Sequence, residues 1–272
     1  MSAGFDVAGR EAPATTPPPR DDDARSPTVR DKVVSAALWG VNLAFLAPAM
    51  GAMTALFSVV PPDRVQPVQR WYCRSQLALT GCRWRAVVHP DVDPDAQYVF
   101  AQNHTNHFDH VAMYNATPHF KQGLELESHF KYPFYGWFMR ARGTIPVPAA
   151  REGRTEGLVA SARAEVERGH SILAFPEGTR TLDGRVGPFR SGVFVMAQRL
   201  GLPIVPVAVT GMYDVMRKGS WIIQPGVDVT VYVEAPVPTE GTTEADLPDL
   251  ERRVHDAIAA RVDAYFDEAG RG

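Results

Sequence analysis

Hydrophobic and polar residues along most of the chain form blocks that predict strands followed by helices. Short apolar runs between turn residues indicate buried strands, and longer stretches with apolar residues three or four apart indicate helices. Strands are predicted at residues 84–89, 97–102, 143–147, 171–175, 204–209 and 228–234. Helices are predicted at residues 108–116, 132–141, 154–168, 190–200 and 246–267. This alternation predicts an α/β fold with a mixed, largely parallel sheet flanked by helices.

Two of these elements carry a further expectation. The strand at 228–234 alternates cleanly between apolar and polar residues, so we expect it at a sheet edge or with one exposed face. The final helix has a stripe of apolar residues at a four-residue spacing, which predicts a face docked on the domain. The stripe consists of Val254, Ile258, Val262 and Phe266.

The N-terminal part of the chain is divided into two segments by composition. Residues 1–30 are rich in Pro, Ala, Thr, Asp and Arg, so they bury too little apolar surface to order themselves and are predicted to be a disordered tail. Because the apolar stretch begins late and follows acidic residues, it does not fit a signal peptide. Residues 31–62 are predicted to be an apolar membrane-anchoring helical segment, and residues 63–272 the catalytic domain.

An uncharged run at residues 33–60 is the basis of the predicted anchor. A helix needs roughly 20 residues to cross a bilayer, so the run is long enough. Pro48 divides it near the middle, and basic residues flank both ends. Balanced flanks favour a kinked or re-entrant hairpin with both ends in the cytosol. A single span and a buried pair of core helices are the alternatives.

Composition narrows the functional classes. The chain has 272 residues, of which 45% are hydrophobic, enough for a substantial core, and its formal net charge is -3. That charge gives no global basic field, so no nucleic-acid partner is predicted. The two cysteines, Cys73 and Cys82, do not have the spacing of a zinc site and do not form a disulfide framework.

A histidine and a carboxylate follow the strand predicted at 97–102. His104 and Asp109 are five residues apart, and residues at this spacing on a straight helix point roughly 140° apart. We therefore expect a turn after His104, with Asp109 entering the next helix. Histidine titrates near neutrality and can accept a proton from an alcohol, while a carboxylate on the other ring nitrogen fixes its tautomer. This pair is predicted to be catalytic, at the edge of the sheet where α/β folds bind ligands.

A second polar segment, FPEGTR at residues 175–180, follows the strand predicted at 171–175. It places Glu177, Gly178, Thr179 and Arg180 on a turn. An arginine fork binds phosphate oxygens in a bidentate way. The segment therefore predicts a binding site for a phosphorylated acceptor.

Four sequence blocks occur in the order of a known family. They are NH followed by Asp109 at 103–109, GTIPV at 143–147 with Arg151 just beyond, FPEGTR at 175–180, and LPIVPV at 202–207. Together they resemble the glycerophospholipid acyltransferase family, in particular the bacterial 1-acylglycerol-3-phosphate acyltransferases. The resemblance covers roughly residues 70–235, and FPEGTR is its most specific motif.

The resemblance implies a reaction, its participants and a location. His104 and Asp109 would move an acyl group from acyl-CoA or acyl carrier protein to the free hydroxyl of 1-acylglycerol 3-phosphate, forming phosphatidic acid in phospholipid biosynthesis. No metal or other cofactor is expected. The enzyme would work on a lipid acceptor at the inner (plasma) membrane, with its catalytic domain on the cytoplasmic face. The expected substrate-binding residues are Arg151, Glu177, Gly178, Thr179 and Arg180.

The sequence departs from the family pattern at two places, so the identity of the acyl acceptor stays open. Residues 148–150 read PAA where the family often has an Asp-Arg pair, and residues 127–130 read ESHF where it often has a Lys-x-Glu-Leu-like stretch. Glycerol 3-phosphate, another lysophospholipid or an aminoacyl lipid are therefore alternative acceptors.

A metal-dependent hydrolase is the alternative from a different functional class. His104, His107, Asp109 and His110 come close to the HxHxDH signature of the metallo-β-lactamase superfamily, but Thr105 stands where that signature needs a histidine. A two-metal site also needs ligands from distant loops. This alternative leaves FPEGTR unexplained, because hydrolysis needs no cradle for an anionic acceptor.

Overall fold

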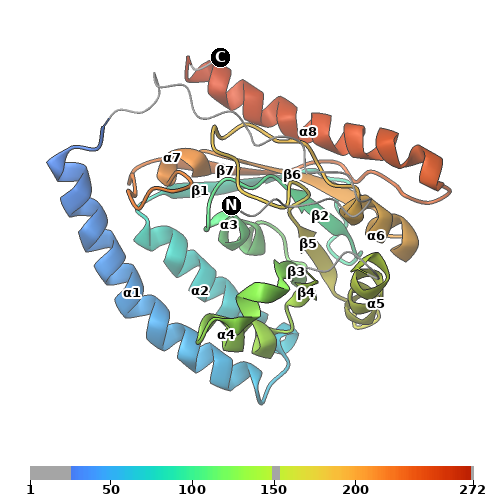
Figure 1. Cartoon of the computed structure of the whole chain (residues 1–272), viewed down its shortest axis with the longest axis horizontal. Coiled ribbons are helices and arrows are strands. Elements are labelled where there is room, and N and C mark those ends of the chain that lie inside the picture. Colours follow the sequence, from blue (N-terminus) through green and yellow to red (C-terminus); the bar gives the residue numbers. More distant parts are fainter. Residues whose placement is uncertain (1–25, 149–153, 271–272) are drawn as a thin grey trace.

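Figure 1 shows the computed structural model of the chain, which describes residues 26–148 and 154–270. Most of the predicted tail and the candidate site residue Arg151 therefore lie outside the described residues.

The core of the fold is one seven-stranded sheet with the order β1-β7-β6-β2-β5-β3-β4. The five strands from β6 to β4 are parallel to one another, whereas β7 runs antiparallel to β6 and parallel to β1. The predicted mixed, largely parallel sheet is thus confirmed. The strands are β1 Arg83–Val88, β2 Val99–Gln102, β3 Lys121–Leu126, β4 Ile145–Val147, β5 Ser171–Ala174, β6 Ile204–Thr210 and β7 Asp228–Val233.

Helices cover both faces of this sheet (Figure 1). They are α1 Val29–Phe57, α2 Gln66–Leu79, α3 Asp109–Ala116, α4 Tyr135–Arg142, α5 Arg154–Val166, α6 Gly192–Leu200, α7 Met212–Val215 and α8 Leu247–Glu268. Short 3-10 turns lie at Pro62–Val65, Glu127–Lys131 and Glu244–Asp246.

Successive residues of β2 point to opposite faces, as the pleat of a strand requires. Phe100 belongs to the core shared with α1, α2 and α3, whereas Val99 and Ala101 belong to the core shared with α5, α6 and α8. The stripe predicted on the last helix is confirmed, since all four of its residues are buried on this second face.

Two strands differ from the sequence prediction. β3 was not predicted, because it begins with polar residues that are nevertheless buried. Lys121 Nζ donates to the carbonyl of His119 at 3.1 Å, and Gln122 exchanges hydrogen bonds with Arg142, so their polar groups are satisfied inside the fold. The edge position predicted for β7 is wrong. β7 lies between β1 and β6, and its Thr230 is buried with its hydroxyl bonded to Arg85 Nε at 3.2 Å.

The apolar N-terminal segment forms one continuous helix, so the predicted hairpin is wrong. Pro48 lies within α1, where it removes a single backbone hydrogen bond, and the helix continues past it to Phe57. One side of α1 packs on the domain beside α2 and α4 (Figure 1). Buried polar side chains fix this position, because Asn42 Nδ2 donates to the carbonyl of Leu79 at 3.1 Å. Within the described residues, α1 is the one helix long and apolar enough to cross a bilayer by length and composition.

Candidate active site

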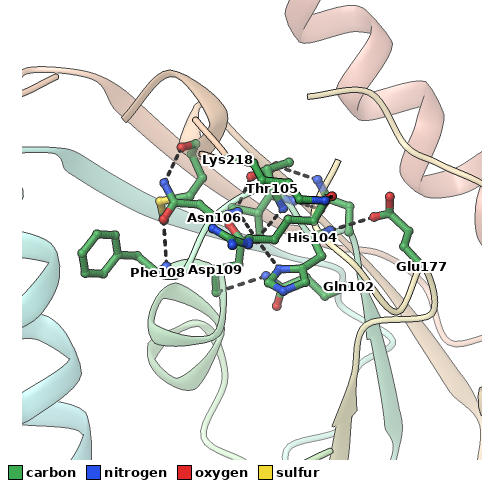
Figure 2. Close-up of polar contacts among 12 residues, drawn as sticks. Gln102, His104, Thr105, Asn106, Phe108, Asp109, Glu177 and Lys218 are labelled. Atoms are coloured by element: carbon green, nitrogen blue, oxygen red, sulfur yellow. Dashed lines mark hydrogen bonds and ion pairs between the residues drawn. The ribbon is translucent and has the colours of Figure 1, made fainter. Parts of the chain in front are cut away.

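His104 and Asp109 meet at the carboxyl end of β2, as the sequence predicts. His104 lies in the turn after β2, and Asp109 is the first residue of α3. His104 Nδ1 lies 2.9 Å from Asp109 Oδ2 (Figure 2). The Asp109 side chain is fully buried, whereas 23% of the His104 side chain is exposed. The ring can therefore reach a substrate while its carboxylate partner is shielded from water.

The backbone after His104 holds the Asp109 carboxylate in place. Oδ2 accepts hydrogen bonds from the backbone N–H of Thr105 at 2.6 Å and of Asn106 at 2.8 Å, and Oδ1 accepts from the Thr105 hydroxyl at 3.2 Å. An ionised carboxylate only accepts hydrogen bonds, so it selects the His104 tautomer with its proton on Nδ1. The Nε2 lone pair is then available to accept a proton.

The other contacts of His104 fix its ring and its backbone. The ring stacks on Phe175 with a centroid distance of 4.2 Å. The His104 carbonyl accepts from the N–H of Thr181 at 2.9 Å, and its own N–H donates to Glu177 Oε1 at 2.7 Å. The FPEGTR segment thus supports the predicted base directly, which makes the two motifs one site.

Glu177 is placed behind His104 and is only 4% exposed. Its second oxygen, Oε2, accepts from the N–H of Gly187 at 2.9 Å. Burial raises the pKa of Glu177 to about 8, although the two backbone N–H groups favour the ionised form. With both oxygens engaged, this side chain joins two loops of the site.

Gly178 and Thr179 form the turn that presents Arg180. Gly178 has φ +66°, a conformation that favours glycine, and a Cβ there would lie 2.7 Å from Arg190 Nε. The Thr179 hydroxyl accepts a hydrogen bond from Lys218 Nζ at 3.1 Å. The neighbouring side chains of Arg190 and Lys218 therefore leave little space around this turn.

The Arg180 guanidinium is partly buried near Asp109, and it makes no hydrogen bond or ion pair with other described residues. Burial lowers the pKa of Arg180, and the nearby Asp109 charge opposes this shift. Lys218 was missed by the sequence analysis. It belongs to none of the four blocks, and only the fold brings it to the carbonyl of Arg180, 38 positions away in the chain, at 2.6 Å.

His107 and His110 flank the site. Burial lowers the pKa of His110 to about 4, so this imidazole is neutral at physiological pH. Burial, Arg180 and His104 also lower the pKa of His107. Across residues 26–148 and 154–270, the structure has no group of three or more His, Cys, Asp or Glu side chains that could hold a metal ion.

The fold and the His–Asp site define an α/β acyltransferase architecture, and comparisons with known proteins agree. Residues 85–210 match the family model described as Acyltransferase. A chloroplastic 1-acyl-sn-glycerol-3-phosphate acyltransferase, BAT2 of Brassica napus, is 31% identical over 143 residues, 53% of this chain and 41% of that protein. The 1-acyl-sn-glycerol-3-phosphate acyltransferase of Haemophilus influenzae is 26% identical over 226 residues, 82% of this chain and 92% of that protein.

The crystal structure of the 1-acyl-sn-glycerophosphate acyltransferase PlsC from Thermotoga maritima has the same fold. Its TM-score is 0.72 at 18% identity, covering 87% of this chain and 96% of that one. The alignments with two plant relatives span about half of those proteins, 41% and 59%. These comparisons support membership of the chain in the glycerophospholipid acyltransferase family.

Proposed function

We propose that this protein transfers a fatty acyl group from acyl-CoA or acyl carrier protein to the free hydroxyl of 1-acylglycerol 3-phosphate, forming phosphatidic acid. The observation that carries the proposal is the Asp109-oriented His104, whose Nε2 is available at the same sheet edge as the unpaired Arg180. The base and the phosphate-binding group that the reaction needs thus occur together. The Brassica and Haemophilus relatives are named as 1-acyl-sn-glycerol-3-phosphate acyltransferases, which supports the same acceptor.

The proposed reaction is a direct transfer. His104 Nε2 takes the proton of the acceptor hydroxyl, and Asp109 stabilises the imidazolium. The acceptor oxygen attacks the thioester carbonyl, and the tetrahedral intermediate collapses to the new ester and a thiolate. The imidazolium returns the proton to this thiolate. Burial raises the pKa of the Cys73 thiol to about 12, so this cysteine is a poor nucleophile and no acyl-enzyme is invoked.

Acceptor recognition is assigned to the turn after β5. Arg180 provides a guanidinium whose donors match phosphate oxygens. Gly178 and Thr179 form the turn that positions this guanidinium. Glu177 supports this turn and the His104 loop together. Arg151 stays a predicted second phosphate contact, since it lies outside the described residues.

The reaction is tested by thiol release from oleoyl-CoA, with and without 1-acylglycerol 3-phosphate. We expect release that needs the acceptor and yields phosphatidic acid, and that is insensitive to chelators. Glycerol 3-phosphate and other lysophospholipids serve as competing acceptors. If one of these competing acceptors is acylated faster, it is the acceptor in place of 1-acylglycerol 3-phosphate. If thiol release does not need an acceptor and is abolished by chelators, the protein is a metal-dependent hydrolase and the proposed acyl transfer is refuted.

We also propose that residues 31–62 anchor the catalytic domain, residues 63–272, to the cytoplasmic face of the inner (plasma) membrane. α1 exposes apolar side chains on the side that faces away from the domain, and α2 and α4 expose aromatic rings. Trp71 contacts Phe45 of α1 at a centroid distance of 5.7 Å, which places this exposed ring of α2 against α1. Because the opposite side of α1 packs on the domain, docking lengthwise in the interface preserves its contacts, whereas crossing would break them. The apolar surface consists of Val33, Val41, Leu43, Trp71, Phe134 and Trp137.

Flotation with phosphatidylglycerol-containing vesicles tests this surface. The double substitution Trp71→Ser and Trp137→Ser is expected to lower the bound fraction several-fold, because aromatic rings favour the interface. Val88→Ser, at an exposed position on β1, is the control. Equal flotation of all three proteins would exclude the aromatic part of the surface.

A further inference from the structure

Two cations lie at the open side of the site without a carboxylate partner. Neither Arg180 nor Lys218 forms an ion pair with any residue of the described chain. The nearest carboxylates are otherwise engaged. Asp109 accepts from His104 and two backbone N–H groups, and Glu177 accepts from two backbone N–H groups. Adjacent unpaired cations repel one another, and an anionic ligand would relieve this repulsion.

Two hydrogen bonds hold the Lys218 ammonium beside the turn that carries Arg180. Its ammonium donates to the Thr179 hydroxyl at 3.1 Å and to the carbonyl of Arg180 at 2.6 Å. An ammonium has three donors, so one N–H is left for a ligand. Burial lowers the pKa of Lys218, and the positive charge of Arg180 lowers it further. The hydrogen bonds hold Lys218 beside the phosphate-binding turn.

We propose that Lys218 is a second ligand of the acceptor phosphate, so that Arg180 and Lys218 form one two-cation subsite for a phosphomonoester. The inference rests on the proposed function and extends it. A phosphomonoester carries a charge of about −1.5 to −2 at neutral pH, which two cations balance. The guanidinium contributes a bidentate fork and the ammonium a point charge, so the pair favours a terminal phosphate over a neutral glycerol hydroxyl.

The segment that carries Lys218, residues 216–226, also connects the site to α1, and we call it the strap. Near the site, Asn106 Nδ2 donates to the carbonyl of Met216 at 2.9 Å. Toward its other end, Trp39 Nε1 donates to the carbonyl of Trp221 at 2.7 Å, and the N–H of Ile223 donates to Ser35 Oγ at 3.0 Å. The apolar helix and the phosphate subsite are thus joined by one short segment, so the position of α1 sets the position of Lys218.

Steady-state kinetics of the full chain in vesicles test the role of Lys218. Lys218→Met should raise the KM for 1-acylglycerol 3-phosphate by about 10- to 100-fold with little change in kcat, because the contact is already made in the ground state. The KM for monoacylglycerol, which lacks the phosphate, should not change. Lys218→Arg should restore most of the affinity, and Arg253→Met, which removes an exposed cation on α8, should have no effect. Trp39→Phe, which removes one of the hydrogen bonds between the strap and α1, should raise the same KM by a smaller factor.

Binding of glycerol 3-phosphate separates this inference from the proposed function. The ligand should raise the Tm of the wild-type protein, and both Lys218→Met and Arg180→Met should abolish this shift while the unliganded Tm stays near that of wild type. If the wild-type protein shows the shift but does not acylate lysophosphatidic acid, the proposed function fails and the subsite stands. A shift retained in Lys218→Met, or no shift in the wild-type protein, would overturn the subsite.

Discussion

Substitution of His104 by alanine is expected to reduce kcat by about 10²- to 10⁴-fold, the range that a positioned general base contributes. In the proposed reaction the ring removes the hydroxyl proton and returns it to the leaving thiolate, so both halves of the reaction would lose their proton carrier. Acceptor KM should change little, because the phosphate contacts do not involve the ring. The fold should persist, since 23% of this side chain is exposed and its Nε2 bonds to no other described residue.

The matched control for this variant is His89→Ala. His89 also lies near a carboxylate, with 3.6 Å between its Nδ1 and Asp91 Oδ2. It follows β1, which runs opposite to the parallel strands around β2, so it lies at the other edge of the sheet. We expect the control to keep wild-type kcat. A His104→Ala enzyme with kcat within a few-fold of wild type, measured with saturating oleoyl-CoA and acceptor, would refute the assignment of the base.

The position of the proposed catalytic pair was predictable from the sequence because its signals are local. An apolar strand, a polar turn and a helix fix where His104 and Asp109 lie, and the five-residue spacing allows only the bent connection that the structure contains. The spacing does not specify how His104 is supported. Glu177 belongs to a motif that suggests ligand binding, yet its carboxyl oxygens accept hydrogen bonds from the backbone N–H groups of His104 and Gly187.

The features that the sequence did not predict depend on contacts between distant segments. β3 has no apolar run, and it is a buried strand because Gln122 finds its partner in Arg142, 20 residues later. Lys218 has no local signature, since its position depends on α7 and on the strap. α1 is continuous through Pro48 because packing on the domain outweighs the loss of one helical hydrogen bond.

The second large effect is expected for Asp109→Asn, which we predict to lower kcat by roughly 10²- to 10⁴-fold, the range that general-base catalysis contributes. The amide has nearly the same shape, and its oxygen can still accept from the N–H groups of Thr105 and Asn106. Because Asp109 Oδ2 is also the atom that faces His104 Nδ1, the amide oxygen would keep the proton on Nδ1, and the NH₂ group would face the Thr105 hydroxyl. The neutral amide would not stabilise the imidazolium that forms when Nε2 accepts the proton of the acceptor hydroxyl.

Glu165→Gln provides the comparison that separates the loss of the Asp109 charge at the site from a general loss of stability. Glu165 Oε2 lies 2.8 Å from His170 Nδ1 in a buried pair just before β5, at the edge of the sheet opposite to His104. Both substitutions remove a buried carboxylate from a histidine, so both should lower Tm. Only Asp109→Asn should abolish turnover at temperatures where both variants are folded. If the two variants lose activity only in proportion to their unfolded fractions, Asp109 is a structural residue; if Asp109→Asn is inactive while folded, the negative charge of the carboxylate is what allows His104 Nε2 to take up the proton of the acceptor hydroxyl.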